Sequence, residues 1–179
     1  MGMEKENLKS NYSRSSDKGN EQFQQTRRQT AGKIILASVA GLTATGGFLA
    51  DWNKTHLFNP NWPPHAKFHD AMSITLASFL GGAGMYFLLR KGTDHHQDVK
   101  LGTMLPAFFW ASQGLSFAFP GAKGLEAEFP ELVPRIKGVW LNEKFAAIAM
   151  LSLSGIGYAF ERQNLNPQTG DAKEQAPII

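Results

Sequence analysis

Residues 71–89 read AMSITLASFLGGAGMYFLL, nineteen consecutive positions without an Asp, Glu, Lys or Arg. A soluble helix of that length would place charged side chains on its water-facing side, at every third or fourth residue. About twenty residues of helix are enough to cross the hydrocarbon core of a bilayer. This run therefore predicts a transmembrane helix rather than the buried helix of a soluble bundle.

The same pattern recurs three times along the chain. Further uncharged runs cover residues 34–50, 101–122 and 145–160. Together the four runs predict an all-α fold, a four-helix transmembrane bundle within a membrane domain of residues 33–161. We expect its spans at about 33–51, 70–90, 101–120 and 140–160. The fourth run is the shortest, so its helix should begin among polar residues at the interface.

Small residues recur inside these runs, among them Gly47, Gly81, Gly84 and Gly157. Helices in lipid are not driven together by hydrophobicity, and small residues let their backbones approach closely enough for dispersion forces to hold them. These glycines therefore predict a closely packed bundle.

Both ends of the chain are polar. Residues 1–32 and 162–179 are rich in Asn, Gln and charged residues and have no apolar periodicity, which is typical of disordered tails. Twelve of the 18 Lys and Arg residues lie in or next to these tails and in the second loop, against six in the first and third loops. Because positively charged flanks stay in the cytoplasm, the sequence predicts a multi-pass membrane protein with both termini cytoplasmic.

The composition excludes several classes of protein. The chain has 179 residues, a formal net charge of +3 and no Cys, so disulfides and Cys-ligated zinc or iron–sulfur cofactors are ruled out. The small net charge, with Lys and Arg at the borders of the uncharged runs, gives no basic groove for nucleic acid. No nucleotide cofactor is expected. The expected partners are membrane lipids, a lipophilic substrate and other copies of the chain or a membrane complex.

The first loop, residues 51–70, holds the densest set of reactive side chains. It reads DWNKTHLFNPNWPPHAKFHD, with three His and two Asp among three Pro and two Trp. Pro64 suits the first turn of a helix. His65 and His69 would then share one helical face, one turn apart.

Three interpretations of this loop stay open. His56, His65 and His69 are candidate ligands of a metal, iron or zinc, since two imidazoles one turn apart can converge on one ion. Alternatively His65 and His69 act as general acid or base with Asp51, joined by Glu143 from the start of the fourth helix. In the third interpretation the imidazoles bind loop carbonyls and anchor helix ends.

Five more residues are candidates for ligand binding. Trp62 and Asn59 belong to the same loop, where Trp62 would otherwise sit in an interfacial aromatic belt. Trp110 and Gln113 lie three residues apart on the third run, and Tyr158 lies on the fourth, so they would line a pocket below the loop. Interhelical packing is the alternative role for these three. The third loop is expected to be a simple connection, or an amphipathic lid over that pocket.

The run D-W-N-x-T-H-x-F-N-P-x-W-P-P-H-A-K-F-H, at residues 51–69, resembles the first-loop signature of a family of small four-span membrane proteins from fungi and bacteria. The resemblance implies the four-span architecture and draws attention to the loop. It implies no particular reaction.

These observations predict an integral membrane protein that acts on or binds a lipophilic small molecule, with acid/base chemistry of the isomerase or cyclase kind at a His/Asp cluster on the non-cytoplasmic face. Such chemistry needs only positioned proton donors and acceptors. Two alternatives remain: a metal-binding membrane protein, and a non-catalytic accessory or assembly subunit of a membrane complex.

Overall fold

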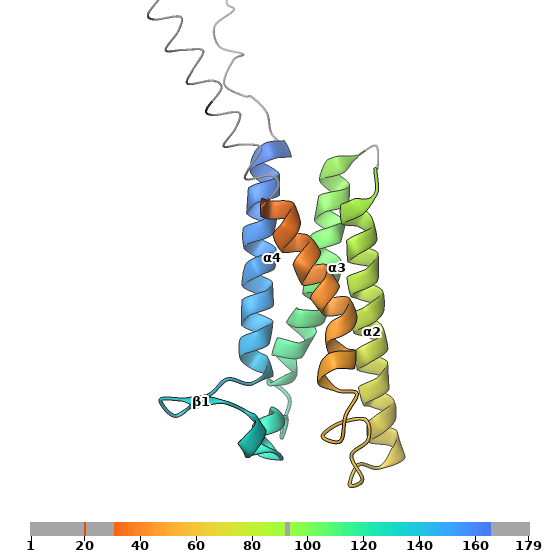
Figure 1. The fold of residues 1–179 in the computed structure, drawn as a ribbon, viewed down its shortest axis with the longest axis vertical. Helices are drawn as coiled ribbons and strands as arrows, with labels where there is room; N and C mark the ends of the chain where they lie inside the picture. The colour runs from red at the N-terminus through yellow and green to blue at the C-terminus, as the bar shows by residue number, and fades with distance from the viewer. Residues whose placement is uncertain (1–19, 21–30, 92–93, 166–179) are drawn as a thin grey trace, which may run out of the picture.

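The computed structural model describes residues 20, 31–91 and 94–165. These residues form a mostly helical bundle of four long helices: Ala31–Ala50, α2 (Pro64–Leu89), α3 (His95–Ser116) and α4 (Glu143–Leu165). Successive helices run in opposite directions, so Ala31 and Leu165 lie at the same end (Figure 1). We call this the tail end. The opposite end, which carries residues 51–63 and 117–142, is the loop end.

The mostly helical fold confirms the prediction from the uncharged runs, and the helix bounds differ from it by a few residues. The third loop departs from a purely α fold. It contains two 3₁₀ turns, η1 (Leu125–Ala127) and η2 (Pro130–Leu132), and a hairpin of β1 (Arg135–Ile136) and β2 (Val139–Trp140). Lys137 and Gly138 both have positive φ, 47° and 85°, and two such residues in succession make the tight turn that joins antiparallel strands.

The start of α2 is fixed by its prolines, as the sequence predicts. Pro63 is extended, with φ −65° and ψ 155°, and Pro64 occupies the first turn. A proline fits there because the first backbone N–H groups of a helix have no partner inside the helix. At the tail end the Asp94 side chain caps α3 by accepting a hydrogen bond of 3.0 Å from the Gln97 N–H.

Helix contacts are made through small residues. A methyl group on Gly81 would collide with the backbone of Ala40 and Ala44 in the Ala31–Ala50 helix. On Gly84 it would meet the Pro106 ring of α3 at 2.6 Å, and on Gly157 the Leu36 side chain at 2.9 Å. The prediction of glycine-mediated packing is thus confirmed at these positions. Gly82 and Gly155 instead face open space.

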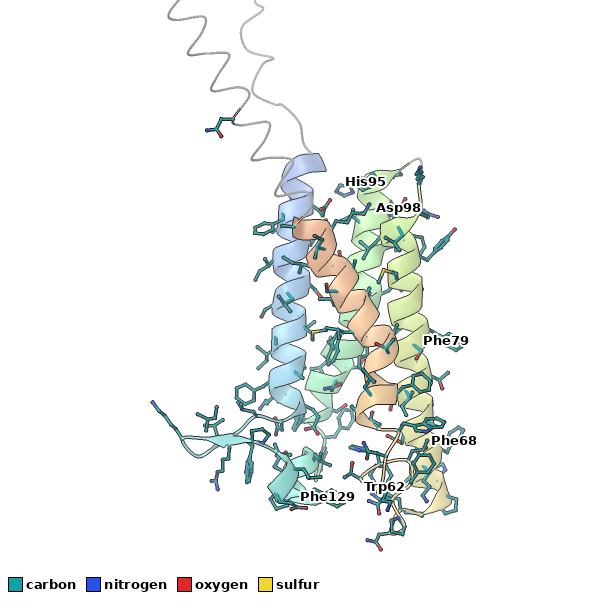
Figure 2. The ribbon with its side chains drawn as sticks, in the orientation of Figure 1. Trp62, Phe68, Phe79, His95, Asp98 and Phe129 are labelled. Atoms are coloured by element: carbon teal, nitrogen blue, oxygen red, sulfur yellow. The ribbon has the colours of Figure 1, made fainter. Side chains whose placement is uncertain are left out.

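The outside of the bundle is apolar. Large hydrophobic side chains such as Leu49, Phe79 and Leu115 are more than 60% exposed, and Figure 2 shows Phe68 and Phe79 pointing away from α2. Two helices, Ala31–Ala50 and α2, are long and apolar enough to cross a membrane. Among the described residues, α3 and α4 are less apolar and do not reach that measure: α4 has charged residues at both ends, and α3 contains polar residues such as Gln113 within its length. The predicted tails lie almost wholly outside the described residues.

Candidate functional site

A cavity of about 930 Å³ opens at the loop end of the bundle. Its apolar walls come from three helices, with Leu42 from Ala31–Ala50, Phe109 and Trp110 from α3, and Ala146 and Met150 from α4. Its loop-end rim is polar. The ionisable residues that line it are Asp51, His56, Asp70, Lys123, Glu128 and Glu143. The sequence predicted that Asp51, His65, His69 and Glu143 share one face of the membrane, and of these Asp51 and Glu143 line the cavity.

The imidazole that lines this cavity is His56. Its Nε2 lies 3.7 Å from Oδ1 of Asp51, which is an ion-pair distance but too long for a strong hydrogen bond. On the other side of the ring, Nδ1 lies 2.8 Å from the Thr55 hydroxyl oxygen. The T-shaped contact with Trp62, at 5.5 Å between ring centroids, also holds the ring in place.

The tautomer of the neutral His56 ring follows from the hydrogen bonds that Thr55 makes. The Thr55 hydroxyl donates to Oδ1 of Asn53 at 2.6 Å, and the same oxygen accepts the Thr55 N–H at 2.8 Å. Because the Thr55 proton is used in this way, its oxygen must accept from His56, so Nδ1 carries the hydrogen. Neutral His56 therefore presents an unprotonated Nε2 beside Asp51, which is the arrangement of a general base with a carboxylate partner.

Asp51 lies just beyond the Ala31–Ala50 helix, where burial raises the pKa of its carboxyl group above the ordinary value of 3.8. The negative charges of Asp70 and Glu143 raise the pKa further, whereas His56 lowers it. These groups are therefore close enough to influence the protonation of Asp51.

Glu143 begins α4 and joins the cavity to the third loop. Its Oε1 accepts the Leu125 N–H of η1 at 3.1 Å, while its Oε2 is buried and has no hydrogen-bond partner among the described residues. Glu126 is arranged similarly. Its Oε1 accepts a hydrogen bond of 2.9 Å from the Asn142 side chain, whereas its Oε2 is buried and has no hydrogen-bond partner among the described residues. Both free oxygens face Gly124, where even a methyl group would collide with them.

Three of the residues predicted to bind a ligand line the cavity: Trp62, Trp110 and Gln113. The Trp110 indole donates to the Thr43 hydroxyl at 2.8 Å, and Gln113 donates to the Glu143 carbonyl at 3.2 Å. Trp62 donates to Glu128 at 3.4 Å and so links the first loop to the third. Figure 2 shows Trp62 at the loop end.

Asn59 and Tyr158 do not line the cavity. Asn59 is buried, and its side chain holds the first loop together by donating to the Thr55 carbonyl at 3.1 Å and accepting from the Asn61 N–H at 2.9 Å. Tyr158 packs against the apolar core cluster that includes Leu36 and Val99.

His65 and His69 converge as predicted but lie outside the cavity. Their Nε2 atoms are 3.1 Å apart on the first turns of α2, and both residues are exposed beside Phe68. His56 does not join them, and the described residues contain no group of three or more His, Cys, Asp or Glu side chains placed to hold a metal ion. The predicted three-histidine set is therefore not assembled.

The sequence interpretation missed Glu128 and Lys123 as cavity residues. Both come from the third loop, which η1 folds against the loop-end rim. The order of four antiparallel helices could have indicated both residues, because it puts the first and third loops at the same end of the bundle. The mixture of apolar and acidic residues in this loop left a lid as an alternative to a simple connection, but it did not indicate which carboxylates would face the cavity.

The tail end carries a second set of buried carboxylates. Asp98 is 1% exposed, and the Arg90 guanidinium donates to its Oδ1 from both Nε and Nη2. Glu161 of α4 is 5% exposed, with its Oε2 4.0 Å from Nε2 of His95. His95 thus faces a buried acid, and Figure 2 shows His95 and Asp98 at this end.

Over residues 34–173 the chain matches DUF6640, a family of unknown function, and it belongs to that family. This agrees with the resemblance to a family without an assigned reaction, while the first-loop signature and the four spans remain predictions. No curated protein and no solved structure is significantly similar to the chain.

Proposed function

We propose that the protein is a four-span membrane protein that binds a lipophilic small molecule in the loop-end cavity and transfers a proton to or from it. The observation that carries the proposal is the composition of the cavity. Apolar walls lead to a rim where a His–Asp pair and further carboxylates meet. A drug-sized ligand typically occupies a cavity of 300–1,000 Å³ with apolar walls and a few polar groups.

The membrane part of the proposal rests on the distribution of side chains. Small residues such as Gly81 and Gly84 make the helix contacts, and large apolar residues such as Leu49 and Phe79 point outward. Exposing so large an apolar surface to water is energetically unfavourable, whereas lipid chains solvate it. We place α3 and α4 in the membrane with their charged ends at the two interfaces, and both termini on the cytoplasmic side from the Lys and Arg distribution.

In the proposed reaction His56 is the proton acceptor. Its Nε2 is unprotonated in the neutral ring, and the imidazolium formed on accepting a proton would be stabilised by Asp51 at 3.7 Å. The imidazolium would then return the proton at another carbon of the same substrate, which restores neutral His56, while Asp51 stays ionised beside it. Removal and return of a proton at two carbons is double-bond isomerisation, and addition to an alkene followed by ring closure is cyclisation.

Binding is tested by filling the cavity. Ala146→Trp places an indole into the wall, and Ala159→Trp puts the same side chain on the exposed face of α4 away from the cavity. Mass spectrometry of lipophilic molecules that co-purify with the full chain should show a species bound to wild type and to Ala159→Trp but absent from Ala146→Trp. An identical complement in all three proteins would refute the proposal.

Proton transfer is tested on the recovered ligand. Incubation with wild-type protein in heavy water should place deuterium on carbon, and His56→Gln should abolish that incorporation while still binding the ligand. Incorporation that is unchanged in His56→Gln would remove this residue from the proposed reaction.

A further inference from the structure

The charges around the loop-end cavity are strongly unbalanced. Four carboxylates line it, from Asp51, Asp70, Glu128 and Glu143. The lining cations are Lys123, which is exposed and makes no ion pair in the part of the chain that the structure describes, and His56 when protonated. The rim is therefore negative even with both counted.

Two of these carboxylates also lack hydrogen-bond donors. Asp70 Oδ2 and Glu143 Oε2 are buried, and the described residues provide neither with a partner. An ionised carboxylate only accepts hydrogen bonds, and leaving one unsatisfied out of water is costly. Gly124 packs against Glu143 Oε2, so a ligand would reduce this cost through electrostatic attraction, by placing a positive charge in the cavity beside the carboxylates.

The cavity walls next to these acids are aromatic. Phe109, Trp110 and Phe117 contribute to the lining. Ring faces attract ammonium groups within about 6 Å. One ammonium of the protein already uses this attraction, since Nζ of Lys144 lies 5.8 Å from the Phe117 ring centroid at the same end.

We propose that the ligand of the loop-end cavity is a cationic amphiphile, with a protonated amine among the rim carboxylates and a hydrocarbon body between α3, α4 and the Ala31–Ala50 helix. This inference rests on the proposed function and adds the chemistry of the ligand's head. An anionic head would be repelled by the four rim carboxylates, and a neutral alcohol offers one donor where an ammonium offers three.

The test compares three probes of equal chain length: dodecylamine, dodecanol and dodecanoate. Each is titrated, as a radiolabelled compound, into the full chain in nanodiscs of phosphatidylcholine, with empty nanodiscs subtracted. We expect the amine to bind roughly tenfold more tightly than the alcohol, as expected for a charge-assisted contact, and dodecanoate to bind weakest. Glu143→Gln should reduce that preference roughly tenfold, while Glu131→Gln, an exposed acid of the same loop away from the cavity, should leave it unchanged.

The outcomes separate this inference from the proposed function. If amine and alcohol bind equally and Ala146→Trp abolishes both, the cavity binds ligands but the cationic head is refuted. If Ala146→Trp affects no probe, cavity binding itself fails and the inference fails with it. An equal loss of amine preference in Glu131→Gln would assign the effect to surface charge and overturn the inference.

Discussion

The two ends of the bundle bury carboxylates beside different numbers of cations. At the tail end Asp98 binds Arg90, and Glu161 lies near Lys33 and His95, although one oxygen of each acid has no hydrogen-bond partner among the described residues. At the loop end Asp51, Asp70 and Glu143 lie near one another around a cavity, and among the described residues the basic side chain paired with them is His56, 3.7 Å from Asp51. A paired buried charge holds helices in place, whereas unpaired carboxylates around an open space cost stability without a ligand. We therefore associate the tail end with helix packing and, under the proposed function, the loop end with ligand binding.

The largest expected effect comes from making the same substitution, Asp to Asn, at both ends, which tests directly whether the two ends differ. Asp98→Asn removes the charge that two Arg90 N–H groups bind, and we expect the free energy of unfolding to fall by about 2 kcal/mol. Asp70→Asn removes an acid with an unsatisfied oxygen and should leave that free energy unchanged or slightly higher. Thermal unfolding of both variants in one nonionic detergent measures the difference, and equal losses would show that the ends do not differ.

The sequence predicted the bundle well because membrane helices are set by composition over nineteen or so residues. The uncharged run at residues 71–89 lies inside α2, and Pro64 marks the start of that helix. Local spacing also predicted the approach of His65 to His69. These features depend on neighbours in the chain, which a single sequence displays.

The candidate site was harder to predict because it depends on how the loops fold over the helix ends. The sequence favoured His65 and His69 for acid/base chemistry and named His56 only as a metal ligand, yet His56 is the one of the three that lines the cavity, held by Thr55 and Trp62. Glu128 reaches the rim through η1, a turn that no periodicity signals. At the tail end, the burial of Asp98 and Glu161 follows from tertiary packing, which the local sequence does not display.

A smaller effect concerns the pH dependence of stability at the loop end. Because the pKa of Asp51 is raised in the folded protein, the folded state binds more protons than the unfolded state once the pH exceeds about 3.8. The free energy of unfolding must therefore fall as the pH rises through the interval between that ordinary value and the raised pKa, and level off above it. The free energy of unfolding of Asp51→Asn should not show this decrease, because the variant has no carboxyl group at that position.

Thermal unfolding from pH 3.5 to 7.5 would show this as a melting-temperature advantage of Asp51→Asn that is small at pH 3.5 and largest near neutrality. Glu131→Gln, which alters an exposed acid, should run parallel to wild type. An advantage that stays constant with pH would contradict a raised pKa at Asp51.

A still smaller change separates the orientation of the His56 ring from its presence. Thr55→Val removes the oxygen that accepts from Nδ1, so the neutral ring should shift its proton to Nε2. Nitrogen-detected NMR of labelled histidine should show the Nδ1–H tautomer in wild type and the Nε2–H tautomer in Thr55→Val. If wild type already carries its hydrogen on Nε2, His56 cannot be the proposed base in its resting state.

The smallest expected effect falls on the histidine pair that the sequence singled out. His65 and His69 donate and accept between themselves at 3.1 Å and lie on the exposed face beside Phe68. His65→Ala should therefore change dodecylamine binding by less than about twofold, within the scatter of substitutions away from a binding surface. His56→Ala, in contrast, alters the cavity rim and should change both affinity and its pH dependence. A loss with His65→Ala as large as that with His56→Ala would move the ligand-binding site from the cavity to the first turn of α2, and the contrast between the two ends would then describe helix packing only.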